Sequence, residues 1–152
     1  MKEKNKKLIL YILLCIVTLC VLFGVIKLNK NRINNILSES YIKDYLHEIK
    51  YEEIESYVME QPNAIIYVSN SKDEDARMFE KKFSKVIKKY NLENDIIYIN
   101  INNTNLVDMN FQNSPILLFY NNKEVFDMVD CKTLNNTNSI IKIFKERHII
   151  ND

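Results

Sequence analysis

An uncharged apolar run near the N-terminus constrains this chain more than any other feature. LILYILLCIVTLCVLFGVI, from Leu8 to Ile26, follows the basic start MKEKNKK and contains no charged residue. At about 1.5 Å per residue it makes a helix of roughly 28 Å, close to the hydrocarbon thickness of a bilayer. We predict a basic tail over residues 1–7, a transmembrane anchor over Leu8–Leu28, a stalk over residues 29–45 and a domain over residues 46–152.

Other interpretations of this run fit less well. A cleaved signal peptide has a shorter apolar core and ends in small residues, which Leu28-Asn29-Lys30 do not supply. Lipid attachment at Cys15 or Cys20 would need a small residue just before the cysteine, and leucine precedes both. A buried globular helix is rarely apolar all round at this length. The basic residues on the two sides differ little, and they favour a single-pass protein of the cell membrane with an extracytoplasmic C-terminal domain.

Charge and glycine content argue against two classes of ligand. Lys plus Arg is 21 and Asp plus Glu is 20, so the net charge of +1 gives no basic excess for a nucleic acid. The one glycine, Gly24, lies in the apolar run. Phosphate-binding turns need several glycines for close backbone approach, so we expect neither nucleic acid nor nucleotide as a partner.

Cysteine and histidine are too sparse for a disulfide or a zinc site in the domain. Cys15 and Cys20 lie within the apolar run, which leaves Cys131 as the one cysteine of the polar remainder. The two histidines, His47 and His148, lie at ligand spacing neither from each other nor from Cys131. We predict no metal and no other cofactor.

Beyond the stalk the hydrophobic periodicity changes repeatedly between strand and helix. It predicts strands over Leu46–Lys50, Ala64–Ser69, Asp95–Ile101, Pro115–Tyr120 and Glu124–Asp130. Helices are predicted over Tyr51–Glu60, from Glu74 to Tyr90, and over Ser139–Arg147. YNNKEV predicts a hairpin between the last two strands, with Asn in place of glycine at the turn. Parallel crossovers plus one hairpin give an α/β mixed sheet with helices on both faces.

A polar turn, Ser69 to Asp75, separates the second strand from the long helix. Ser71 and Glu74 fit a capping box at the start of that helix. The three consecutive carboxylates from Asp73 to Asp75 could bind a cation or a basic partner. Acidic residues are also common in the first turn of a helix because its dipole attracts them, and we prefer this interpretation.

At NSPILLFYNNKEVFDMVDCKT, from Asn113 to Thr133, the chain resembles the C-terminal half of thioredoxin. The shared features are a proline opening a strand, an apolar run, a tight polar turn, a Glu-Val strand and a final helix. The resemblance covers roughly Leu46 to Arg147 and implies a thioredoxin-like fold with Pro115 cis beside the active site. The chain is also similar to small membrane-anchored thioredoxin-like proteins of low-GC Gram-positive bacteria, including the bacteriocin transport accessory type.

In the thioredoxin family the turn between this strand and this helix holds Cys-x-x-Cys. Lys72 and Asp75 occupy those two places here, and neither side chain can exchange a disulfide. The resemblance therefore implies a degenerate, non-catalytic domain. Thioredoxins bind extended peptides beside the cis-proline, which implies a surface for a protein or peptide around Ser71, Lys72, Asp75, Ser114 and Pro115.

Two other functions remain open at this point. Cys131 follows the hairpin, in a loop that borders the active site in thioredoxins, and could serve a single-cysteine thiol-disulfide oxidoreductase if it were exposed and acidic. A free cysteine is otherwise commonly a small buried filler. Alternatively, the anchor and the tyrosines of the stalk region assemble a membrane complex, with the domain as a spacer.

Overall fold

The computed structural model describes residues 2–102 and 114–151 of the chain. Its contacts divide it into two compact units, Met1–Leu37 and Ser38–Asp152. The first unit is formed by helix α1 (Lys2–Ser38). Within α1, the segment Tyr11–Lys30 has a mean hydropathy of 2.6 and is long and apolar enough to cross a membrane. Asn113, the first residue of the thioredoxin-like stretch, lies outside the described residues.

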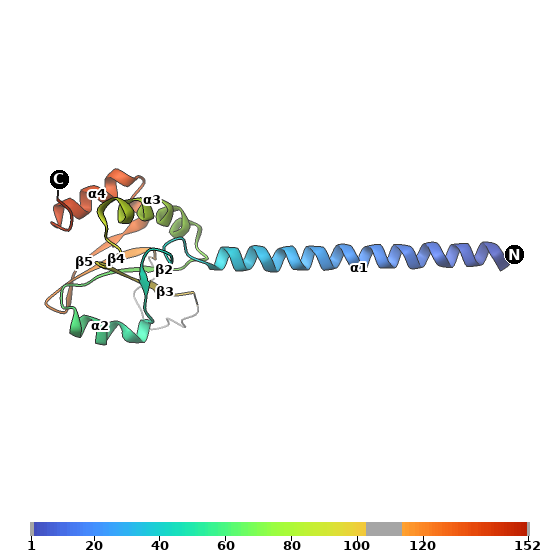
Figure 1. Cartoon of the computed structure of the whole chain (residues 1–152), viewed down its shortest axis with the longest axis horizontal. Helices are drawn as coiled ribbons and strands as arrows, with labels where there is room; N and C mark the ends of the chain where they lie inside the picture. The colour runs from blue at the N-terminus through green and yellow to red at the C-terminus, as the bar shows by residue number, and fades with distance from the viewer. Residues whose placement is uncertain (1, 103–113, 152) are drawn as a thin grey trace. The chain divides into compact units, whose positions relative to one another are not determined.

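The second unit is a five-stranded mixed sheet with helices on both faces, which confirms the predicted fold class (Figure 1). In chain order its elements are β1 (His47–Glu48), the 3-10 helix η1 (Tyr51–Glu53), α2 (Ile54–Glu60), β2 (Ile65–Ser69), α3 (Glu74–Tyr90), β3 (Ile96–Asn100), β4 (Ile116–Asn121), β5 (Glu124–Asp130), η3 (Cys131–Thr133) and α4 (Thr137–Glu146). The sheet order is β1-β3-β2-β4-β5. β1, β2 and β3 are parallel, while β4 is antiparallel to both β2 and β5.

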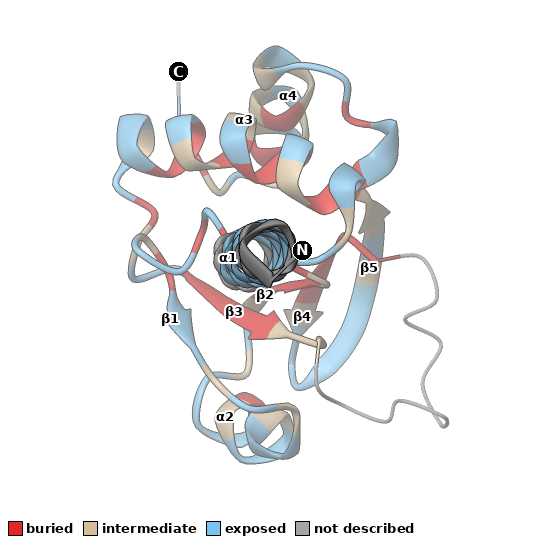
Figure 2. Ribbon diagram, turned by 90° about the vertical axis from the view of Figure 1, so that its right-hand side faces the viewer, coloured by how far each residue is buried: buried red, intermediate tan, exposed pale blue. Residues whose placement is uncertain are grey.

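Two apolar clusters hold the layers together, one on each face of the sheet. Alternate residues of a strand point to opposite faces, so Tyr67 of β2 joins the cluster under α3 and α4, while Ile66 and Val68 join the cluster under α2. All three side chains are fully buried. Figure 2 shows burial concentrated in the central strands and on the inner face of α3. The central strands therefore form the rigid support for the loops at their ends.

Helix α3 begins at Glu74 because Asp73 caps it. The Asp73 side chain accepts a hydrogen bond from the Asp75 backbone N–H at 3.1 Å. The predicted capping box of Ser71 and Glu74 is wrong, because Ser71 precedes the cap by two residues. The helix ends at Asn91, whose left-handed φ of 54° suits asparagine in a chain with so little glycine.

The hairpin between β4 and β5 turns at Asn122 and Lys123, as predicted. Their φ angles are 50° and 72°, and positive values at both central residues match the twist of the flanking strands. Asparagine tolerates this backbone well, whereas lysine adopts it rarely.

Residues 39–46, which we call the strap, connect α1 to β1 and lie on helix α3. Residues 39–45 were expected to belong to a polar stalk. In the structure, however, Ile42 is fully buried and Leu46 is 4% exposed, and both belong to the cluster under α3. Arg77 of α3 donates from Nη1 to the carbonyl of Glu39 at 3.2 Å. The Tyr41 ring lies 5.1 Å from the guanidinium carbon of Arg77. The strap is therefore part of the packed unit.

We expect Ile42→Ala to lower the free energy of unfolding by about 2–5 kcal/mol, because it leaves a cavity against α3. Urea unfolding of the full chain in detergent micelles, followed by near-UV circular dichroism of the tyrosines, measures this. Lys43→Ala, at an exposed neighbour, is the matched control and should change stability by less than about 0.5 kcal/mol. Equal, small effects of both substitutions would show that the strap does not support the core.

Candidate functional site

The polar turn, residues 70–73, leaves the end of β2 and lies beside the start of β4. The backbone N–H of Asn70 donates to Ser114 Oγ at 3.0 Å, which joins the turn to the segment before Pro115. The Ser114–Pro115 peptide bond is cis, as the resemblance to thioredoxin implied. The structure thus brings together the two segments that the sequence singled out, although they are far apart in the chain.

Neutral polar side chains hold this turn in place. The Lys72 backbone N–H donates to Asn70 Oδ1 at 3.0 Å and to Asn102 Oδ1 at 3.3 Å. The Asn102 side-chain amide donates to the hydroxyl of Ser71, and the Asn100 amide lies 3.4 Å from the same oxygen. Asparagines at the end of β3 therefore fix the turn at the end of β2.

The five predicted binding residues fall into two groups by exposure. Ser71, Ser114 and Pro115 are buried, so they support the surface rather than form it. Lys72 and Asp75 are exposed, and they present a positive and a negative group to solvent. The described part of this surface is polar, with Met78, which is 50% exposed, as a nearby apolar side chain of α3. A ligand here would meet charges and amide groups.

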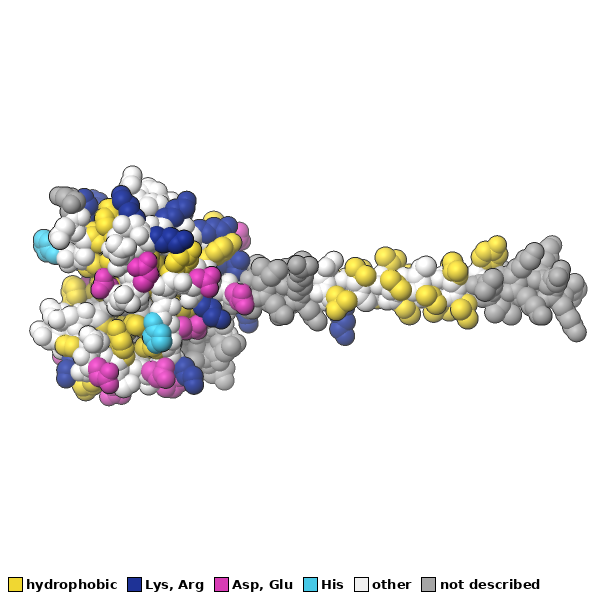
Figure 3. All heavy atoms as spheres, viewed as in Figure 1, with side chains coloured by type: hydrophobic (Ala, Val, Ile, Leu, Met, Phe, Trp, Pro, Cys, Tyr) yellow, Lys and Arg dark blue, Asp and Glu magenta, His cyan; other side chains and the backbone are white. Residues whose placement is uncertain are grey.

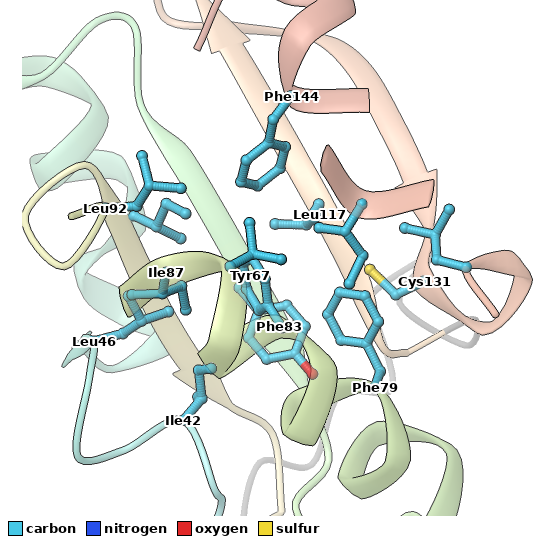
Figure 4. Packing of buried hydrophobic residues seen from close by; sticks show 14 of the residues in the cluster. Ile42, Leu46, Tyr67, Phe79, Phe83, Ile87, Leu92, Leu117, Cys131 and Phe144 are labelled. Atoms are coloured by element: carbon cyan, nitrogen blue, oxygen red, sulfur yellow. The ribbon is translucent and has the colours of Figure 1, made fainter. Parts of the chain in front are cut away.

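Cys131 lies in the core rather than at the surface. It is 1% exposed, and its sulfur points into the cluster toward Leu117 (Figure 4). Burial raises the pKa of its thiol well above the ordinary value, and the Asp130 carboxylate raises it further. A nucleophilic cysteine needs the opposite, an accessible thiol with a lowered pKa. Neither requirement of the oxidoreductase alternative is met.

Glu80 of α3 is a buried carboxylate that the sequence analysis did not identify. Its side chain is fully buried and accepts the Tyr41 N–H at 2.8 Å and the Ser69 hydroxyl at 2.8 Å. The Tyr67 hydroxyl donates to it at 3.4 Å, and the Ser40 hydroxyl also bonds to it. It therefore links the strap, β2 and α3 at one point.

Burial also controls the protonation of this cluster. Desolvation raises the pKa of Glu80, although the hydrogen bonds from Ser40, Ser69, Tyr41 and Tyr67 lower it in part. Burial raises the pKa of Tyr98, whose hydroxyl lies 3.4 Å from Ser69 Oγ, to about 12. Both core tyrosines stay neutral donors over the physiological range, since desolvation also raises the pKa of Tyr67.

The sequence did contain a signal for Glu80. The residue lies between Phe79 and Phe83 on the apolar stripe of α3, where a charged side chain has to point at the sheet. A charge at such a position predicts buried hydrogen-bond partners. The partners themselves come from β2 and the strap, which no local pattern connects to α3.

A hollow of the described surface lies apart from the polar turn. This hollow, of about 490 Å³, lies at α2 and the β4–β5 turn, lined by Tyr51, Glu52, Ile54, Glu55, Val58, Met59, Tyr120 and Lys123. It includes none of the five predicted residues. Within residues 2–102 and 114–151, no group of three or more His, Cys, Asp or Glu side chains is placed to hold a metal ion.

The fold of the chain has counterparts among solved structures. No family model and no curated protein sequence matches the chain. It is similar to the crystal structure of thioredoxin f2 from Chlamydomonas reinhardtii, with a TM-score of 0.54, 12% sequence identity, and coverage of 70% of this chain and 99% of that one. Oxidised mitochondrial thioredoxin 3 from Saccharomyces cerevisiae gives a TM-score of 0.49 and 11% identity, covering 71% of this chain and 99% of that one. With the sheet order described above, the first of these shows a thioredoxin-like fold.

We expect Cys131 to react with an alkylating reagent at least about 100-fold more slowly in the folded chain than in the denatured chain, because its thiolate is neither accessible nor favoured. Mass spectrometry of a Cys15→Ser/Cys20→Ser variant measures the rate at this one thiol. Similar rates in the two states would restore Cys131 as a candidate nucleophile.

We expect Glu80→Gln to change how stability depends on pH. Because the pKa of Glu80 is raised in the folded chain, its contribution to stability is complete below its ordinary pKa of 4.5 and is lost as the pH rises through the folded value. The free energy of unfolding of the wild type minus that of Glu80→Gln should therefore fall from about pH 4 upward. Urea titrations over a pH series measure it.

Glu55→Gln, at an exposed position of α2, is the control for the general effect of losing a carboxylate. A difference for Glu80→Gln that stays constant or rises with pH would contradict the raised pKa.

Proposed function

We propose that this chain is a membrane-anchored thioredoxin-like domain that binds a protein or peptide without dithiol chemistry. The observation that supports it best is the junction of the turn with Ser114, made by the Asn70 N–H···Oγ bond of 3.0 Å. Lys72 and Asp75 are exposed beside this junction, at the two places where thioredoxins carry their thiols. In this proposal the binding geometry of the fold is retained while its redox groups are replaced.

The ligand we propose is a hydrophilic segment in an extended conformation. Extended peptides bind through backbone hydrogen bonds, with side chains supplying specificity, and this mode needs no cysteine. Lys72 and Asp75 offer charges of both signs to such a segment, while the buried Ser71 and Ser114 keep the turn and the strand in register. Recognition then depends on complementary polar groups rather than on apolar burial.

We further propose that α1 anchors the domain in the cell membrane, with the domain on the extracytoplasmic side. The hydropathy of Tyr11–Lys30 supports the anchor. The lysines of MKEKNKK support a cytoplasmic N-terminus. In this proposal the chain is similar in organisation to the small membrane-anchored thioredoxin-like proteins of low-GC Gram-positive bacteria, of which the bacteriocin transport accessory type is one.

A photocrosslinking residue in place of Lys72 tests the binding surface. In cells that make the full chain, we expect a partner-dependent product from this position and none from the same residue at Lys142, an exposed position of α4. Gels resolve the product, and mass spectrometry identifies its second component. Equal products from both positions, or none from Lys72, would contradict the proposed surface.

Charge reversal then tests the role of Asp75. Asp75→Lys should reduce the Lys72 product about threefold or more, which corresponds to roughly 0.7 kcal/mol of binding free energy. The loss of one favourable interaction with the helix dipole is too small to unfold the chain, at about 0.3–1 kcal/mol. Glu146→Lys makes the same charge change on α4 and should leave the product unaltered.

A further inference from the structure

Basic side chains gather on helix α3 of the globular unit, beyond its acidic first turn. Helix α3 carries the basic residues Arg77, Lys81, Lys82, Lys85, Lys88 and Lys89. On the other face, the segment from η1 to the end of α2 carries Glu52, Glu53, Glu55 and Glu60 and no basic residue. Figure 3 shows Lys and Arg gathered over the half of the unit that holds α3 and α4, whereas the half that holds α2 shows Asp and Glu together with some Lys and Arg. The net charge of +1 conceals this uneven distribution.

The lysines of the basic row on α3 differ in their partners. In the part of the chain that the structure describes, neither Lys82 nor Lys85 forms an ion pair. Lys81 and Lys88 lie over tyrosine rings of the strap instead, 5.1 Å from the centroid of Tyr41 and 4.6 Å from that of Tyr45. These contacts orient the ammonium groups without neutralising them. Within the described residues, the positive charges of Lys82 and Lys85 are therefore not offset by an ion pair.

The strap that lies on this row is also the covalent connection to α1. Residues 31–38 separate the apolar segment Tyr11–Lys30 from the strap, and they span about 12 Å as a helix. The polar headgroup region of a bilayer is roughly 5–8 Å thick on each side of the hydrocarbon core, which is less than this span. In a membrane that contains the apolar segment, chain connectivity therefore limits how far the start of the strap can lie from the hydrocarbon core, to about 12 Å while residues 31–38 are helical.

We propose that the basic row of α3 binds anionic phospholipid headgroups of the membrane that holds α1. This inference rests on the proposed membrane anchorage, and it adds a second interaction surface to the domain. Each Lys or Arg near an anionic surface is attracted to it, and the attraction fades within a Debye length. The four glutamates on the α2 face are repelled by the same surface, so both faces favour one orientation. Tyr41, which is 41% exposed on the strap, suits a membrane interface as well.

Lysine acylation of the full chain in lipid nanodiscs tests this surface. The chain is reconstituted with phosphatidylglycerol or with phosphatidylcholine, treated briefly with an N-hydroxysuccinimide ester, and mapped by mass spectrometry. In phosphatidylglycerol we expect Lys82 and Lys85 to react about threefold or more slowly than in phosphatidylcholine, and about 0.5 M salt should remove the difference. Lys50 and Lys123, exposed and away from α3, are internal controls that should react equally in both lipids.

Two matched variants separate local contact from total charge. Lys82→Glu/Lys85→Glu reverses two charges on the row and avoids the tyrosine contacts of Lys81 and Lys88. In it, the remaining α3 lysines should lose most of their protection in phosphatidylglycerol. Lys50→Glu/Lys123→Glu makes the same change in net charge on the other side and should retain the protection. Equal loss in both variants would show an effect of net charge and overturn the proposed surface.

The remaining outcomes distinguish this inference from the anchorage on which it rests. If the chain does not co-elute with nanodiscs of either lipid, the membrane anchorage itself fails. If it co-elutes with both but Lys82 and Lys85 react equally in the two, the anchorage stands and the lipid surface is overturned. Protection that appears only when nucleic acid or an acidic protein is added would assign the row to that ligand and overturn the proposal as well.

Discussion

The hydrogen bonds to the buried carboxylate of Glu80 determine how the rest of this domain is assembled. A carboxylate in a core is costly unless several donors satisfy it, and here they come from the strap, from Tyr67 and from Ser69. These donors belong to two segments, the strap and β2, while Glu80 itself belongs to α3. The Glu80 carboxylate therefore specifies one arrangement of the strap, the sheet and α3. The surrounding aromatic rings supply most of the apolar burial.

That arrangement also determines the candidate site. Ser69, which donates to Glu80, is the last residue of β2, and the polar turn follows immediately. From there Asn70 reaches Ser114, and Asn102 reaches the turn from β3. The turn is thus held from below by the core and from both sides by neighbouring strands. These hydrogen bonds involve backbone groups, asparagine amides and serine hydroxyls, so the conformation of the turn does not depend on a disulfide.

The sequence predicted what depends on local pattern and missed what depends on contacts between distant segments. Alternation and helical stripes located every strand and α-helix of the described part of the domain, but not the 3-10 helix η3, and the proline with its hairpin indicated the fold. The N-cap residue of α3 is Asp73 and not the predicted Ser71, because several polar residues in one turn can each cap a helix. The burial of Ile42 and of Cys131 had no local signal. Both follow from where the strap and the loop after β5 meet α3.

The same distinction applies to charge. Net charge is summed along the chain, whereas a ligand responds to the charges within about a Debye length of it. In this fold α3 and α2 lie on opposite faces of the sheet, so their opposite charges are held apart by the apolar core (Figure 1). A nearly neutral chain can therefore present one strongly basic face. Because Lys81 and Lys88 of α3 lie over tyrosine rings of the strap, the segment that joins the globular unit to α1 is itself part of that basic face.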